Sequence, residues 1–196
     1  NVTFKEDETF EPYLVAKIKG EDLKFYFKDA ESIKEERVEN ALFIGMKTIY
    51  RGFAFDKEFS FATLSAIEKE KGCFFTQLNP VKESTEQLMH FSYPRPISFK
   101  EVRSDWYSVI TVGEGALIPN DSKQNLVFDH RWDLDVGLMN GRSNTMPWYG
   151  LVRENQGFMA LALDDRDAGF YYSKEPNQPI HLENIQYSEL GRMAYP

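Results

Sequence analysis

The sequence predicts an all-β fold, an antiparallel β-sandwich with few short helices, and three observations support this. Aromatic residues make up 15% of the 196 residues, with 16 Phe and 10 Tyr, and both types favour the pleated, half-buried surface of a sheet. Short strand-like runs recur along the chain and are separated by turns rich in Gly, Pro and Asn. No helical periodicity extends beyond about three turns. Many short strands with turns between them are typical of sandwiches and barrels.

In the first half of the chain, apolar residues alternate or cluster in the manner of strands. The expected strands cover residues 13–19, 23–28, 41–50, 52–55, 59–68 and 73–78. The first run places Leu14, Ala16 and Ile18 on one face, which is the period of two of a half-buried strand. Gly20-Glu21-Asp22 and Glu70-Lys71-Gly72 have the composition of hairpin turns.

Two segments of this half do not show the pattern of a strand. Residues 29–40 are highly charged and lack a clean period, so a short helix or a solvated loop is expected there. Residues 79–98 contain Asn79-Pro80 and Tyr93-Pro94-Arg95-Pro96. Because proline cannot donate a ladder hydrogen bond, we expect a loop here, with a short helix over residues 83–90.

In the second half, the strongest signal is a strict alternation over residues 128–136. One face carries Phe128, His130, Trp132, Leu134 and Val136, and the other carries Asp129, Arg131, Asp133 and Asp135. A period of two over nine residues predicts a half-buried strand. The other expected strands cover residues 106–112, 147–153, 158–163, 169–172 and 180–187.

The charge of the chain excludes two classes of partner. The formal net charge is −8, from 23 Lys and Arg against 31 Asp and Glu, and no basic cluster offsets it. Such a chain repels phosphate backbones and anionic lipid surfaces, so no nucleic acid partner is expected. No apolar run approaches the roughly 18 residues that span a bilayer, so no membrane insertion is expected. Neutral ligands such as sugars remain open.

The length of the chain suits one domain, because a single β-sandwich often reaches this size. We find no internal repeat and no low-complexity linker, and therefore expect residues 1–196 to form a single β-sandwich domain. The sequence begins at Asn1 and ends at Tyr195-Pro196, just after a further strand-like stretch has started. We therefore expect it to be a fragment of a longer multidomain chain.

The single cysteine, Cys73, permits no disulfide within the chain. It precedes Phe74 and Phe75, and a cysteine in an apolar setting behaves as a small hydrophobic residue. We therefore expect Cys73 to be buried.

No complete catalytic or metal-binding set is readable, and no cofactor is expected. His90, His130 and His181 are far apart in the sequence, whereas a zinc site needs several converging ligands. Asp133-Leu134-Asp135 fits the polar outer face of its strand, and Asp164–Gly169 fits a turn capped by aspartates. Motifs for a serine nucleophile, a phosphate-binding loop or a dinucleotide are missing from the sequence.

Aromatic residues give the candidate binding site. Indole rings stack on sugar rings while nearby amide and guanidinium groups bind the hydroxyls. One predicted hairpin end gathers such residues, and we take as candidate substrate-binding residues Trp148, Tyr149, Arg142, Asn140 and Asn144. For Trp106 and Trp132, a place in the core is the simpler interpretation.

Several segments of the second half together resemble a known domain. They are Gly115-Ala116-Leu117-Ile118-Pro119-Asn120, Met146-Pro147-Trp148-Tyr149-Gly150-Leu151, Gly157–Leu163 and Asp167-Ala168-Gly169. They resemble the N-terminal β-supersandwich domain of bacterial glycoside hydrolases, in the group similar to endo-α-N-acetylgalactosaminidase. The resemblance covers about residues 106–190. It implies a galactose mutarotase-like fold, a catalytic barrel that follows, and a periplasmic or secreted location.

Three functions follow as hypotheses. The first is a non-catalytic accessory domain that supports the catalytic barrel and contacts glycan near Trp148. The second is a stand-alone carbohydrate-binding module. The third is a mutarotase-like enzyme that uses a histidine, His130 or His181, beside a glutamate.

Overall fold

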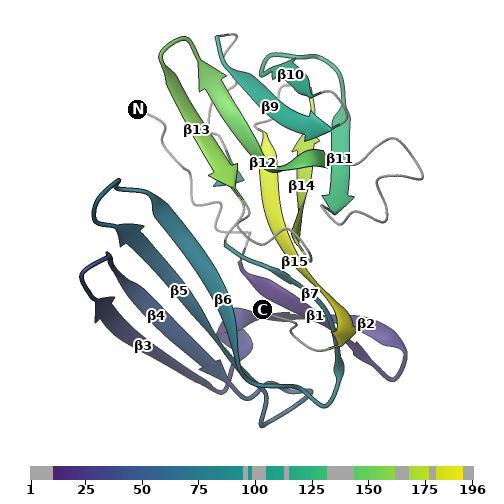
Figure 1. Ribbon diagram of the computed structural model, residues 1–196. Coiled ribbons are helices and arrows are strands. Elements are labelled where there is room, and N and C mark those ends of the chain that lie inside the picture. The colour runs from purple at the N-terminus through teal and green to yellow at the C-terminus, as the bar shows by residue number, and fades with distance from the viewer. Residues whose placement is uncertain are drawn as a thin grey trace. The chain divides into compact units, whose positions relative to one another are not determined.

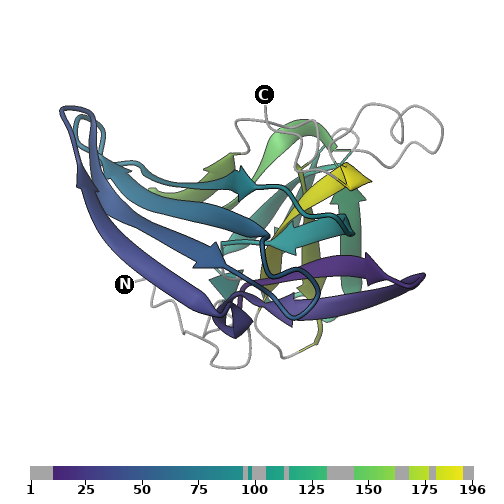
Figure 2. The ribbon, with the colours of Figure 1, turned by 90° about the horizontal axis from the view of Figure 1, so that it is seen from below.

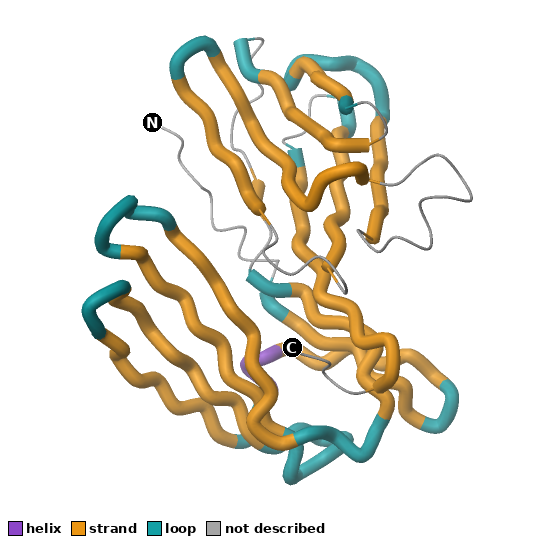
Figure 3. The backbone as a smooth tube through the Cα atoms, in the orientation of Figure 1, coloured by secondary structure: helices purple, strands orange, loops and turns teal. Residues whose placement is uncertain are grey.

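The computed structural model describes residues 11–94, 97–98, 105–112, 115–131, 144–161, 168–176 and 180–191. The chain divides into two compact units. Of the described residues, 11–94 and 188–191 belong to the N-terminal unit, and those from 97 to 187 belong to the C-terminal unit. Each unit has a hydrophobic core of its own. The chain is nearly all β and its sheets are antiparallel (Figures 1 and 3), which confirms the predicted fold class. The single-domain interpretation stays a prediction.

The N-terminal unit contains seven strands and one short 3₁₀ helix. The strands are β1 (Tyr13–Ile18), β2 (Glu21–Tyr26), β3 (Ser32–Glu39), β4 (Phe43–Arg51), β5 (Ser60–Glu68), β6 (Phe74–Lys82) and β7 (Gln87–Ser92), and the helix η1 is Phe27–Asp29. Strand β1 pairs with both β2 and β7. The other four form a meander in the order β3-β4-β5-β6, and Figure 2 shows its twist.

The turn between β1 and β2 is a tight two-residue hairpin. Ile18 pairs with Glu21, so only Lys19 and Gly20 lie between the strands. Both have positive φ, 52° and 89°, which is the conformation of a type I′ turn and suits glycine at the second position. The hairpin was expected at Gly20, and the structure places Glu21 and Asp22 already in β2.

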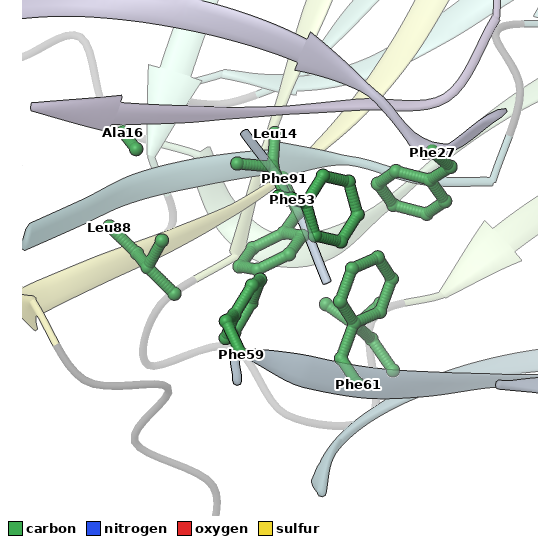
Figure 4. Packing of buried hydrophobic residues seen from close by; sticks show 9 residues of the cluster. Leu14, Ala16, Phe27, Phe53, Phe59, Phe61, Leu88 and Phe91 are labelled. Atoms are coloured by element: carbon green, nitrogen blue, oxygen red, sulfur yellow. The ribbon is translucent and has the colours of Figure 1, made fainter. Parts of the chain in front are cut away.

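Phenylalanine fills the core of the N-terminal unit (Figure 4). Phe61 of β5 lies at its centre, with ring centroids 4.8 Å from Phe27, 5.8 Å from Phe53 and 5.4 Å from Phe91. Leu14 on β1 is fully buried in the same cluster. The rings meet in stacked and edge-to-face pairs, which add to the stabilisation from area burial alone. The high phenylalanine content is thus explained by packing.

Two predicted non-strand segments are strands. The segment at residues 29–40 was expected to be a helix or a loop, and it contains β3. This strand is an edge of its sheet, and it carries ion pairs between Lys34 and Glu36 and between Arg37 and Glu39. Charged edges protect against unwanted pairing, and they also remove the alternation that would have revealed the strand.

The loop expected at residues 79–98, with a helix over 83–90, is wrong as well. Strand β6 continues to Lys82 through Pro80, which is tolerated because β6 is also a sheet edge. Strand β7 begins at Gln87 and inserts Leu88 and Phe91 into the core. Long-range pairing with β1 outweighs local propensity here.

The prediction that Cys73 is buried is also wrong, because Cys73 lies before β6 and is exposed.

Among the described residues, eight strands lie wholly or mostly in the C-terminal unit. They are β8 (Ile97–Ser98), β9 (Tyr107–Val112), β10 (Ala116–Pro119), β11 (Leu126–Arg131), β12 (Asn144–Arg153), β13 (Gln156–Leu161), β14 (Ala168–Lys174) and β15 (His181–Gly191). One sheet has the order β10-β9-β12-β13, and β14 pairs with β11 and β15 in the other. The strand expected at 128–136 corresponds to β11, and its residues 132–136 lie outside the described residues.

The inner faces of these strands form the second core. Ile110 of β9, Tyr149 and Leu151 of β12, Tyr172 of β14 and Leu182 of β15 are all buried and in one cluster. Burial of such side chains is the main stabilising term of a sandwich. Trp106 packs against this cluster, as expected, and Trp132 lies outside the described residues.

One aspartate connects two loops of the N-terminal unit. Asp56 Oδ1 accepts hydrogen bonds from the backbone N–H of Glu58 and of Phe59, at 2.9 and 3.1 Å. Its Oδ2 accepts the N–H of Thr85 at 2.9 Å and the hydroxyl of Ser84 at 3.2 Å. Burial alone would raise the pKa of Asp56, but these hydrogen bonds favour the carboxylate and lower its pKa overall.

We expect Asp56→Asn to lower the free energy of unfolding by about 1–3 kcal/mol at neutral pH, because the amide nitrogen cannot accept these hydrogen bonds. Since the pKa is lower in the folded protein, the contribution is complete above the ordinary aspartate pKa. It is lost as the pH falls through the folded value. Urea unfolding at about pH 7 and about pH 3 measures both, since these bracket the ordinary aspartate pKa.

Asp22→Asn is the matched control. Asp22 is exposed and 3.8 Å from Lys17, and an exposed ion pair of this kind contributes little. Equal losses of stability in the two variants, or a loss in Asp56→Asn that does not shrink in acid, would contradict the role given to Asp56.

Candidate functional site

The structure places three of the five predicted binding residues, all on β12. Asn140 and Arg142 lie outside the described residues. Asn144 begins β12, and only its backbone is described. Trp148 and Tyr149 are neighbours in the same strand, so their side chains point to opposite faces of the sheet. A binding role for these residues remains a prediction.

Tyr149 belongs to the core. Its side chain is 1% exposed, and its hydroxyl donates a hydrogen bond to Asn184 Oδ1 at 2.9 Å. Burial raises the pKa of Tyr149 to about 12. Tyr149 therefore anchors the inner face of β12 to the core, and of the two residues Trp148 has the accessible ring.

Trp148 lies half-buried on the opposite, outward side. Its Cζ3 is 3.8 Å from the position that a β-carbon would take on Gly150, so the indole reaches over that glycine. The carbonyl of Trp148 accepts a hydrogen bond from Thr111 Oγ1 at 2.8 Å. Pro147 precedes it where the pairing of β12 with β9 is irregular, which is a site where a sheet tolerates proline.

The strands around Trp148 form an apolar outward surface. The pairings align Trp148 with Leu161, Val152 with Tyr107, and Gly150 with Met159, and aligned residues share a face. Leu117 of β10 aligns with Val109 of β9, which in turn aligns with Gly150 of β12. We define the outer apolar face as Tyr107, Leu117, Trp148, Val152, Met159 and Leu161. Among side chains that the structure describes, no outward one on these four strands is charged.

Sequence reasoning missed most of this face, although a signal for it exists. Residues 158–163 read Phe-Met-Ala-Leu-Ala-Leu, with no polar residue. A strand that faces solvent on one side should alternate, and an unbroken apolar run indicates that both sides are covered. In the structure, only one side of this strand is covered: Phe158 and Ala160 pack on the core, while Met159 and Leu161 are exposed.

Buried polar groups lie beneath the inner face. Tyr172 donates to Ser108 Oγ at 3.4 Å, and Ser108 donates to Asn120 Oδ1 at 3.2 Å. Burial raises the pKa of Tyr172. Lys174 of β14 is also buried, and its Nζ donates to the carbonyl of Glu175 at 2.6 Å. Burial lowers the pKa of Lys174, while the charge of Asp121 opposes the shift. These hydrogen bonds satisfy groups that would otherwise destabilise the core.

One histidine lies beside a carboxylate. His181 Nε2 is 3.6 Å from Glu183 Oε2, and both side chains are largely buried. They are two residues apart in β15 and so share one face, opposite to that of the core residue Leu182. The ring of Tyr171 meets His181 edge-on at 6.1 Å. His90 instead packs against Tyr13, and the side chain of His130 is not described.

No metal site is found among the described residues, in which no three His, Cys, Asp or Glu side chains converge. Asp133, Asp135 and the segment 164–167 lie outside them. Nor does any helix in the described part of the chain have the length and apolar character needed to cross a bilayer.

Comparison with known proteins finds likeness only at the level of structure. No family model and no curated protein sequence matches this chain. Solved structures do match, among them α-N-acetylgalactosaminidase NagBb from Bifidobacterium bifidum in complex with Gal-NHAc-DNJ. The TM-score is 0.82 with 24% identity, over 96% of this chain and 29% of that chain.

Other structures of the same protein agree. The GalNAc complex gives a TM-score of 0.80 with 24% identity, over 96% of this chain. The ligand-free structure gives 0.75 with 22% identity, over 95% of this chain. In both, the match again covers 29% of that chain. At such identity the likeness shows the fold, and this chain spans less than a third of the matched protein.

We expect Tyr149→Phe to reduce the free energy of unfolding by about 0.5–1.5 kcal/mol, because it removes the hydrogen bond to Asn184. It should also remove the tyrosinate transition of Tyr149, which burial raises to a pKa of about 12. Urea unfolding and an ultraviolet titration of tyrosinate measure these effects. Tyr107→Phe, which changes an exposed ring, should change stability by less than about 0.5 kcal/mol. An unchanged alkaline transition in Tyr149→Phe would contradict the assignment.

Proposed function

We propose that this chain is a non-catalytic accessory domain of a glycoside hydrolase and supports a catalytic barrel in the same polypeptide. The main support for this proposal is the structural match, in which nearly the whole of this chain corresponds to 29% of a glycosidase chain. The sequence segments that resemble the N-terminal domain of such enzymes agree with this. Because the catalytic residues would lie on the barrel, this chain alone should not cleave glycosides.

The finer parts of the proposal concern fold, ligand and location. We assign the fold to the galactose mutarotase-like β-supersandwich, as the sequence resemblance implies. The candidate residues Asn140, Arg142 and Asn144, which lie close to Trp148 in the sequence, would contact glycan in the substrate cleft. The location would be periplasmic or secreted, as in the enzymes that the sequence resembles.

The test compares this chain with the natural polypeptide that contains it. We expect the longer protein to release the chromophore from a 4-nitrophenyl α-N-acetylgalactosaminide, the sugar in the name of the matched enzyme, and this chain alone to release none. In the longer protein, Arg142→Ala should raise KM more than it lowers kcat, because Arg142 would bind substrate without taking part in the chemistry.

Two outcomes would overturn the proposal. Hydrolysis by the 196-residue chain alone would make it an enzyme in its own right. A natural polypeptide without a second domain would remove the partner that the accessory role requires, and saturable binding of the sugar by the chain alone would then favour a stand-alone carbohydrate-binding module. In that module, Trp148→Ala should abolish binding without unfolding the protein.

The contact between His181 and Glu183 favours a second candidate, a mutarotase-like enzyme. A histidine and a carboxylate held together can exchange protons with a sugar as general acid and base. If they do so here, the chain accelerates the approach of freshly dissolved α-D-galactose to anomeric equilibrium, and His181→Gln and Glu183→Gln each abolish the acceleration.

Polarimetry measures this rate, and His90→Gln serves as the control because His90 lies in the N-terminal unit, where its ring packs against Tyr13. Melting temperatures show that each variant is folded. A parent rate equal to the spontaneous rate eliminates the mutarotase candidate and leaves the accessory role in place.

A further inference from the structure

We infer that the outer apolar face (Tyr107, Leu117, Trp148, Val152, Met159 and Leu161) is the surface on which the catalytic domain of the same polypeptide docks. The inference rests on the proposed function and adds to it the location and chemistry of the contact.

Apart from the half-buried Trp148, the side chains of the outer apolar face are exposed. Leu117 is 60% exposed, Met159 63% and Leu161 52%. They are not scattered, because strand pairing places the six residues in adjacent rows across β10, β9, β12 and β13. Isolated exposed apolar residues are ordinary, whereas a contiguous apolar patch marks an interaction surface.

The chemistry of the outer apolar face suits a protein partner better than a sugar. Sugar sites combine one or two aromatic rings with several groups that bind hydroxyls. On this face, only the hydroxyl of Tyr107 and the indole N–H of Trp148 are polar, and the remaining four side chains are aliphatic. Depletion of charge and enrichment in aromatic residues and Met are typical of the buried centre of protein interfaces.

The apolar character of the face suits a partner that stays bound permanently. Interfaces that never open are the more apolar ones, and a domain of the same polypeptide is such a permanent neighbour. The matched glycosidase contains its counterpart of this fold within a single longer chain. A partner of this kind explains why a sheet face without charge is acceptable on a chain that is otherwise strongly acidic.

The outer apolar face needs no rearrangement to serve as a docking surface. The same strands are anchored from behind by Ile110, Tyr149 and Leu151, all at most 1% exposed. On the outer side, Trp148 is held over Gly150 and its carbonyl is bound by Thr111. A rigid surface loses little conformational entropy when it binds.

Hydroxyl-radical footprinting with mass spectrometry tests the inference without any mutation. Methionine is readily converted to its sulfoxide, so the oxidation rate of Met159 reports its exposure. We expect Met159 to oxidise several-fold more slowly in the natural polypeptide than in this chain. Met46 on β4 of the N-terminal unit, 42% exposed, is the internal reference for radical dose.

Each result has one meaning. Equal Met159 rates in a polypeptide that does contain a catalytic domain overturn the docking surface and leave the accessory role standing. A polypeptide without such a domain overturns both. Protection of Met159 that develops in this chain alone as its concentration rises makes a second copy the occupant, and protection by added N-acetylgalactosamine makes it a sugar. Either result overturns the inference.

A pair of charge insertions gives an independent check. In the natural polypeptide, Met159→Glu should abolish the protection of Leu117 and Leu161, because a buried unpaired carboxylate is costly. Met46→Glu should leave that protection unchanged. Both sites are exposed in this chain, so both variants should keep its melting temperature. Full protection of Leu117 in Met159→Glu would contradict docking on this face.

Discussion

Neighbouring residues of a β-strand point to opposite faces of the sheet, and this constraint determines what each part of the C-terminal unit can do. On β12 it sends Tyr149 and Leu151 into the core and Trp148 and Val152 outward. A shift of one residue in the pairing would exchange the two sets. The buried hydrogen bond between Tyr149 and Asn184 can form in only one register, so the same contact that stabilises the core also determines which residues form the outer face.

The two units manage their surfaces differently. In the N-terminal unit, the edge strand β3 is covered with ion pairs, for example between Lys34 and Glu36, and it is unsuited to pairing with another chain. In the C-terminal unit, the described outward side chains of the four strands around Trp148 carry no charge. An apolar face has a cost in solubility, and natural sequences retain one where a partner covers it.

Much of the fold could be predicted from the sequence, because period-two patterns and turn residues act locally. The strands at 13–19, 41–50 and 59–68 and the turn at Gly20 could be identified in this way. Strand β7 could not, because its position depends on pairing with β1, more than seventy residues earlier. Strand β3 was hidden because charges on both of its faces imitate a loop.

For the candidate site, the aromatic pair at 148–149 could be predicted from the sequence. Which of the two residues is buried and which is accessible could not. From the sequence alone, Trp148 and Tyr149 were equally good candidates for binding. Only the strand register shows that Tyr149 lies in the core and Trp148 on the accessible side. The unbroken apolar run at 158–163 carried the missing information about the outer face. It is ambiguous by itself, since a strand covered on both sides and a short buried helix share that composition.

The exposure of Cys73 has a practical consequence. It is the only thiol of the chain, and it lies at the hairpin between β5 and β6. A maleimide dye or spin label should therefore attach at one defined point of the N-terminal unit. The same thiol can join two molecules when air oxidises it, so covalent dimers will form during storage unless a reductant is present. Without a reductant, measurements of self-association would therefore detect disulfide-linked dimers as well as any association through a sheet face.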